Sequence, residues 1–214
     1  MLTICRLTLI ALTTPTLGLA TDAGMKSFSL KTGYFTQSGS LNSGINKWNV
    51  DSSGYSIVGN VDVMEHVIIG GSYLSGTATV GSADFDHTQA SLATGYIISN
   101  NLNRAEGKGS KSGLGISFSA AEIFYPGGYL ETNGTEVYWQ SVFGMVESVS
   151  GSVAISAPID KLGEYVTGSI GLAYNLNDAH GINLQYNFYS AVDKYDVSTK
   201  SSLSGLTLSY VFLN

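Results

Sequence analysis

Hydrophobic and polar residues alternate at every second position along most of the chain from Phe28 onward. This period is typical of β-strands with one apolar and one polar face, and helical spacing is nearly absent. The C-terminal third shows it most clearly. One face there carries Val166, Ile170, Leu172, Tyr174 and Leu176, and the other carries Thr167, Ser169, Gly171, Ala173 and Asn175. The pattern predicts an all-β protein.

The same alternation places the other strands and the connections between them. It predicts strands at 28–35, 54–63, 67–77, 89–98, 166–176, 182–189 and 206–212. Tight turns are expected at 64–66 and 177–181, and longer polar loops at 36–52, 80–88 and 190–202. Glycine-rich and polar stretches interrupt the pattern between 99 and 164, where we expect strands at 114–121, 136–147 and 152–157.

The strand count favours a closed antiparallel barrel. A membrane barrel with both termini on the periplasmic side needs an even number of strands. Seven strands lie outside the interrupted region, and its length suits three more. The expected fold is therefore an up-and-down transmembrane β-barrel of about ten strands, with eight or twelve as alternatives. The first and last strands must pair, because lipid offers no partner to an open sheet edge.

The N-terminus has the features of an export signal. Arg6 precedes an apolar stretch at 7–19, and Gly18-Leu19-Ala20 forms a small-x-small cleavage site. We therefore expect a signal peptide at 1–20 and a single barrel domain at 21–214. Cys5, the only cysteine, lies within the expected signal peptide, so the mature chain would contain no disulfide and no lipid-anchoring cysteine. No later run is long and apolar enough for a membrane-spanning helix.

Alternation alone does not say which face points outward, because a soluble sandwich or lipocalin-like barrel has the same period. Three features favour apolar faces toward lipid. The polar faces of several strands carry serine, threonine, asparagine, glutamine and glycine rather than lysine and glutamate, whereas about a quarter or more of the residues on a water-facing surface are usually charged. Short turns alternate with longer loops. Aromatic residues fall near the expected strand ends, where membrane interfaces favour them: Tyr34, Tyr55, Tyr73, Tyr96, Tyr165, Tyr174, Phe188 and Phe212.

The last strand carries a resemblance to a known group of proteins. Its sequence at 205–212 is similar to the terminal insertion signal of bacterial outer-membrane proteins, with Gly205, Leu208, Tyr210 and Phe212 at the characteristic positions. Leu213 and Asn214 follow, whereas the group usually ends at the aromatic residue. With the signal peptide, the chain resembles small outer-membrane barrels such as opacity-type adhesins and porin-like barrels.

That resemblance implies a place in the outer membrane of a Gram-negative bacterium. The implied partners are the lipid bilayer, lipopolysaccharide and the barrel-insertion machinery; no external partner is indicated. No cofactor is expected. Nucleic acid is excluded as a partner because the net charge is -6 and the ten basic residues are scattered.

Some polar residues are expected to face the barrel interior. Lys31 and Asp62 lie on the polar faces of the first two strands and would either pair or line a narrow pore. Asn183, Gln185 and Asn187 form a polar ladder on one strand, which would either hydrogen-bond to neighbouring strands or wet a passage. These five residues are the candidates for the lining of the lumen.

His87 with Asp84 and Asp86 is the one cluster with catalytic or metal-binding chemistry. A solvated acidic loop is the favoured interpretation, and we expect no enzyme activity and no catalytic, cofactor or metal site. Three functions follow: a structural or surface-interaction barrel displaying the loops at 36–52, 80–88 and 190–202; a narrow passive channel; and, least favoured, a hydrolase at the outer rim.

Overall fold

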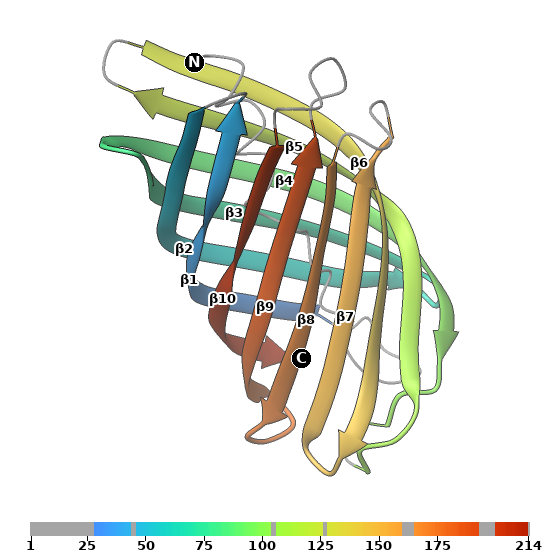
Figure 1. Cartoon of the computed structure of the whole chain (residues 1–214). Coiled ribbons are helices and arrows are strands. Elements are labelled where there is room, and N and C mark those ends of the chain that lie inside the picture. Colours follow the sequence, from blue (N-terminus) through green and yellow to red (C-terminus); the bar gives the residue numbers. More distant parts are fainter. Residues whose placement is uncertain are drawn as a thin grey trace.

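The computed structural model describes residues 28–43, 46–103, 106–125, 128–159, 165–192 and 200–213. These residues form ten strands and no helix, and none of them belongs to a helix that could span a membrane. The strands are β1 (Phe28–Ser43), β2 (Asn46–Met64), β3 (Val67–Val80), β4 (Ala83–Asn100), β5 (Ser110–Tyr125), β6 (Gly128–Val146), β7 (Val149–Pro158), β8 (Tyr165–Asn175), β9 (His180–Val192) and β10 (Lys200–Leu213) (Figure 1).

Each strand pairs antiparallel with the next, and β1 pairs with β10 to close the barrel. The closing ladder runs from Ser29 opposite Leu213 to Asn42 opposite Lys200. Closure leaves no strand edge unpaired around the wall, as a lipid environment requires. The expected ten-strand up-and-down barrel is confirmed, including three strands between 99 and 164.

The prediction of long loops at 36–52 and 80–88 is wrong, because these segments are paired strands. β1 and β2 stay paired through 36–52 as far as Ser43 opposite Asn46, and β3 and β4 stay paired as far as Val80 opposite Ala83. The segment 36–52 is rich in serine and asparagine, and the segment 80–88 contains Gly81, Asp84 and Asp86, so both look like polar loops although their backbones pair normally. In the third loop, strands enter from both sides and 193–199 lies outside the described residues.

Large apolar side chains on all ten strands point away from the barrel. On β8, for example, Ile170 is 59% exposed while its neighbour Ser169 is 3% exposed. Leu92, Leu114, Leu184 and Leu208 are exposed in the same way on other strands. A soluble barrel would bury these side chains inside. The structure therefore turns its apolar faces outward, as the sequence predicted.

Outward aromatic rings occur at several places on the wall. Tyr34 lies opposite Tyr55, with ring centroids 5.4 Å apart. Toward the end of the barrel where β1 begins and β10 ends, which we call the terminal end, Tyr174 and Tyr210 both pair with Ile182. The other large apolar residues on the outer face are mostly leucine, isoleucine and valine, so the wall carries an apolar band. Tyr34 and Tyr55 were expected at strand ends, but they lie mid-strand because β1 and β2 continue beyond them.

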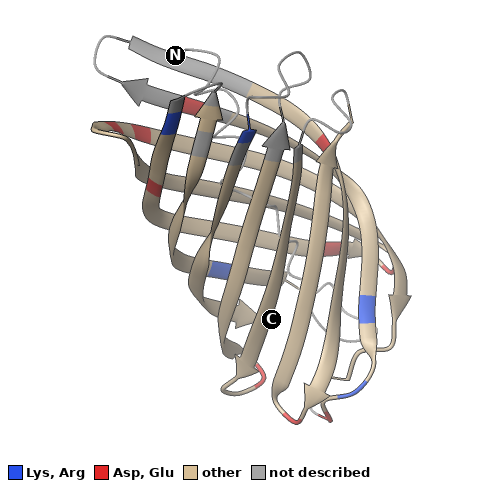
Figure 2. Cartoon of the chain, in the orientation of Figure 1, with Lys and Arg blue, Asp and Glu red and all other residues tan. Residues whose placement is uncertain are grey.

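Beyond the Tyr34–Tyr55 level, the first four strands project as a paired sheet. We call residues 36–43, 46–53, 75–80 and 83–88 the β1–β4 extension. Its outward residues are polar or charged, and threonines on β3 donate to carboxylates on β4: Thr77 to Asp86 at 3.1 Å and Thr79 to Asp84 at 2.7 Å. Figure 2 shows most charged residues near the strand ends and the turns, with a largely uncharged wall between.

Candidate functional site

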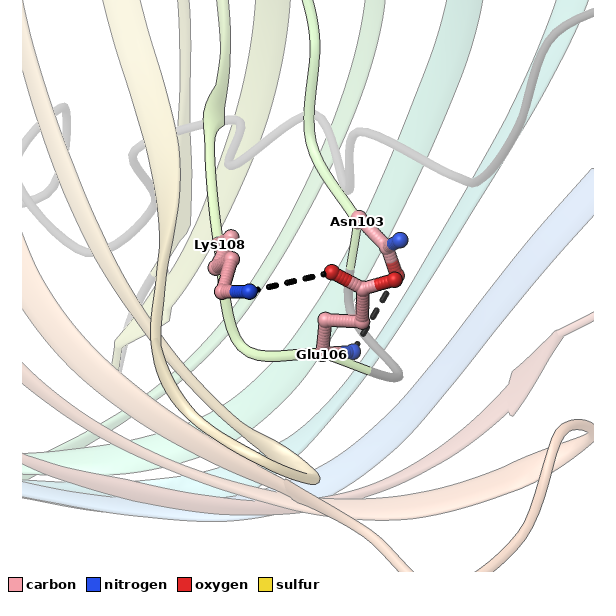
Figure 3. Close-up of polar contacts among 3 residues, drawn as sticks. All are labelled: Asn103, Glu106 and Lys108. Carbon is pink, nitrogen blue, oxygen red and sulfur yellow. Dashed lines mark hydrogen bonds and ion pairs between the residues drawn. The ribbon is translucent and has the colours of Figure 1, made fainter.

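The connection between β4 and β5 folds back at the terminal end of the barrel, where β1 begins and β10 ends. Asn103 and Lys108 exchange backbone hydrogen bonds of 2.8 and 2.9 Å. The Asn103 side-chain oxygen accepts from the backbone N–H of Glu106 at 3.1 Å, and Lys108 contacts Glu106 at 3.3 Å (Figure 3). Because both charged side chains are exposed, their ion pair adds little stability. The backbone bonds hold the turn together.

This turn inserts one apolar side chain into the lumen. Leu102 is 8% exposed and belongs to a buried cluster, which we call the Leu102 cluster: Ile68, Ala93, Ile97, Leu102, Tyr138 and Val142. Gly107 has φ +62° and lies so close to the backbone of Val146 that a Cβ would collide with it. The N–H of Gly144 donates to the carbonyl of Gly109 at 3.0 Å. The turn is therefore fixed against β6 with Leu102 inside.

An ion pair joins two strands that are not neighbours. Lys111 Nζ lies 3.1 Å from Asp62 Oδ2, and the side chains are 1% and 13% exposed. Because β2 and β5 are separated by β3 and β4, this contact reaches across part of the lumen. Sequence reasoning singled out Asp62 but missed Lys111. Extending the alternation of β5 back by four residues would have placed Lys111 on the inner face.

The polar ladder on β9 forms side-chain hydrogen bonds at one end and lines a cavity at the other. Gln185 donates to Asn187 at 2.8 Å, and Asn187 donates to Thr207 on β10 at 2.9 Å. Asn183 is 3% exposed and lies beside a cavity of about 40 Å³ at the terminal end of the lumen. Lys31 also lines this cavity. All five residues proposed from the sequence thus lie on inward-facing positions of their strands.

A buried hydrogen-bond chain connects three adjacent strands elsewhere in the lumen. Ser156 on β7 donates to the carboxylate of Glu136 on β6 at 2.7 Å, and its hydroxyl lies 2.6 Å from that of Thr167 on β8. Glu136 is 3% exposed. Sequence reasoning did not single out these residues, because a serine or threonine on a polar face gives no sign of its partner.

At the level of the β1–β4 extension, an aromatic ring lies across the inner wall. Phe35 covers Gly54 and Gly76, where Cβ atoms would come within 2.9 and 3.0 Å of its ring. The ring reaches His87 on β4, with centroids 6.3 Å apart. His87 is 1% exposed, and neither of its ring nitrogens has a hydrogen-bond partner.

The predicted cluster of Asp84, Asp86 and His87 does not come together. The two carboxylates are exposed on the outer face of the extension, and His87 points inward, because adjacent strand residues alternate between faces. Since the segment lies beyond the apolar band, water reaches its outer surface. Burial lowers the pKa of His87 to about 4, and Asp86 raises it by a smaller amount.

The other two histidines lie at the terminal end and contact outward aromatic rings. His66 lies 5.5 Å from Tyr96 between ring centroids, and His180 Nδ1 lies 2.5 Å from the hydroxyl of Tyr210. Among the described residues, no group of three or more histidine, cysteine, aspartate or glutamate side chains could hold a metal ion.

No family model and no curated protein matches the chain. Solved structures are similar to it in fold. The attachment invasion locus protein of Yersinia pestis is 13% identical, with a TM-score of 0.40, over 88% of this chain and all of that one. An outer-membrane channel from Pseudomonas putida F1 is 10% identical, with a TM-score of 0.48, over 94% and 100%. Neisserial surface protein A is 12% identical, with a TM-score of 0.41, over 87% and 95%.

A closed wall with an apolar outer band and a polar inner face decides where the protein resides. It is an outer-membrane β-barrel. In such barrels the end where the first strand begins and the last strand ends usually faces the periplasm, so we expect the β1–β4 extension on the exterior side, and this orientation stays a prediction. On β10, Leu208, Tyr210 and Phe212 point outward into the band. Their role with Gly205 as an insertion signal stays a prediction.

Proposed function

We propose that this outer-membrane barrel has a structural and surface-contact role and presents the β1–β4 extension outside the cell. The carrying observation is that four paired strands continue beyond the Tyr34–Tyr55 level with polar outward side chains. Loops long enough to form a separate binding surface are absent between β1 and β2 and between β3 and β4. The contact surface is therefore the rigid sheet itself.

Contacts in the lumen support a barrel that does not conduct freely. At the periplasmic end, the Leu102 cluster and the Asp62–Lys111 pair join side chains from strands that are not adjacent. Barrels of about ten strands are narrow enough for such side chains to fill much of the interior. This arrangement favours display over transport.

Cysteine labelling tests the exposure of the extension. Asp51 is exposed on its outer face, and Asp178 is exposed in the turn between β8 and β9 at the periplasmic end. A membrane-impermeant maleimide applied to intact cells should label Asp51→Cys, and should label Asp178→Cys only after the outer membrane is permeabilised. The opposite pattern would overturn the proposed orientation.

A shortened hairpin tests the contact role. Gly39 and Val50 are ladder partners, so residues 40–49 can be replaced by Asn-Gly without shifting the register. The variant should retain the heat-dependent gel shift of a folded barrel while cell-to-cell adhesion and adhesion to coated surfaces fall. Unchanged adhesion in a folded variant would reject the extension as the contact surface.

A narrow passive channel is a second candidate, favoured by the polar cavity near Lys31 and Asn183. Planar-bilayer recording separates the two functions. The surface role predicts a flat current baseline from the reconstituted protein. Discrete current steps would reject the surface role in favour of the channel.

A further inference from the structure

β6 continues past the end of its neighbour β7. The ladder between the two strands ends with Glu136 opposite Pro158. β6 itself begins at Gly128, and from there it pairs with β5. Among the described strands, residues 128–134 therefore have a ladder partner on the β5 side and none on the β7 side. We call these residues the β6 edge, and Figure 1 shows this yellow part of β6 as the uppermost strand of the wall.

The backbone groups along the β6 edge point to the side where a further strand can pair. The carbonyl of Thr135 accepts from the N–H of Ile159 at 2.9 Å, so Thr135 directs its backbone groups toward the β7 side. This direction alternates along a strand, so Asn133, Glu131 and Tyr129 direct their N–H and C=O groups to the same side. A row of such groups is a template for pairing with another chain.

The connection from β7 to β8 is too short to cover the whole edge. It joins Ile159 to Tyr165 through residues 160–164, and these must lead away from β7 and return to β8. At roughly 3.3 Å per residue, such a connection advances at most about 10 Å along β6, whereas the edge spans roughly 23 Å. Tyr129 and Glu131 therefore lie beyond its reach.

The charge beside the edge selects the kind of strand that fits it. Glu122 on β5 lies opposite Glu131 in the ladder and is exposed, and Asp86 on β4 is exposed on the same outer face. The edge itself contains Glu131 and no lysine or arginine. A second copy of this segment would add like charge, which destabilises a strand pair, whereas lysine or arginine on an incoming strand would oppose the carboxylates.

We propose that the β6 edge docks an extended segment of another protein as an added antiparallel strand, with lysine or arginine on its outer face. Main-chain hydrogen bonds supply the affinity of such an addition, and alternate side chains supply its specificity. The edge lies outside the β1–β4 extension, so this docking goes beyond the contact role proposed for that sheet.

A short synthetic peptide that alternates lysine with threonine tests the docking, with fluorescence anisotropy measured on the full barrel in detergent micelles. Asn133 is exposed and directs its backbone groups to the open side, so residues opposite this face of β6 direct their N–H groups toward the edge. Methylating the lysine backbone amides should weaken binding by about tenfold or more, because it removes the pairing donors. Methylating the threonine amides, which point away, should change binding by less than about twofold.

Glu131→Pro tests the edge from the side of the barrel. It removes a donor that points away from β5, so the β5 ladder keeps its hydrogen bonds. Peptide binding should be about tenfold weaker than for Glu131→Thr, the matched control that removes the same charge and keeps the N–H. The heat-dependent gel shift identifies folded variants, and the methylated peptides decide the question if Glu131→Pro does not fold.

Four results would overturn the proposal. Wild type might bind no peptide, or Glu131→Pro and Glu131→Thr might bind it equally when folded. Equal binding of the two methylated peptides would show charge attraction without strand pairing. Barrel dimers in micelles that Glu131→Pro separates would assign the edge to a second copy of the chain. The assay contains no cells, so its result is independent of adhesion by the β1–β4 extension.

Discussion

Leu184 lies in the middle of the apolar band, so a charge introduced there tests whether the outer wall faces lipid. It is 46% exposed on β9, opposite Leu172 on β8 and Leu208 on β10. Phe188 lies four residues toward the exterior and His180 four residues toward the periplasm. At about 3.3 Å per residue and a strand tilt near 40°, each interval spans roughly 10 Å of depth. Leu184 is therefore close to the midplane of a band roughly 25 Å tall.

Leu184→Arg should cost about 2–4 kcal/mol of folding free energy, as expected for arginine at the bilayer midplane. That corresponds to a roughly 30- to 1000-fold lower ratio of folded to unfolded protein, at about 1.4 kcal/mol per tenfold. Guanidinium unfolding in phospholipid vesicles, followed by tryptophan fluorescence, measures it. The control is Thr77→Arg on the extension, which should cost less than about 1 kcal/mol. Equal costs for both variants would refute a lipid-facing band.

Three further predictions concern the interior. Leu102→Ala should destabilise the barrel by about 2–5 kcal/mol in the same unfolding assay, whereas a change below about 0.5 kcal/mol would show that Leu102 does not pack inside. Lys111→Met should lower the free energy of unfolding by about 3–5 kcal/mol, because it leaves the Asp62 carboxylate without this partner. Adding Asp62→Asn should restore part of that stability. Additive losses in the double variant would contradict a coupled pair. In the folded barrel the pKa of His87 is about 4, below its ordinary 6.5, so between these values the unfolded chain binds a proton more readily than the folded one. The free energy of unfolding should therefore be highest above pH 6.5 and fall by about 3 kcal/mol as the pH drops to 4. Comparing wild type with His87→Gln by acid unfolding isolates this effect, and identical pH profiles would reject it.

The sequence predicted the wall better than it predicted the ends of the strands. In the apolar band, each strand alternates bulky apolar and small polar residues, and a slip of one residue would turn every side chain to the wrong face. That constraint is visible in the sequence alone. In the extension the outer face is polar and the inner face mixes polar and apolar residues, so the residues from Thr36 to Ser52 look like a loop although their backbones are paired.

The interior contacts were less predictable, because they join residues far apart in the chain. Lys111 reaches Asp62 only after three intervening ladder pairings fix the register of β2 to β5. Leu102 is a single apolar residue in a polar connection, and no local pattern shows that the turn folds inward. His87 and Asp86 are adjacent in sequence, and the two-residue period of the strand separates them.

The sequence by itself determined the all-β class, the approximate strand number and which residues share a face, because these depend on a local period of two. Closure of the wall, the projection of the extension and the pairing of interior charges were decided only by the tertiary structure. Each depends on the register between strands, which backbone hydrogen bonding sets across the whole barrel and which no short segment contains.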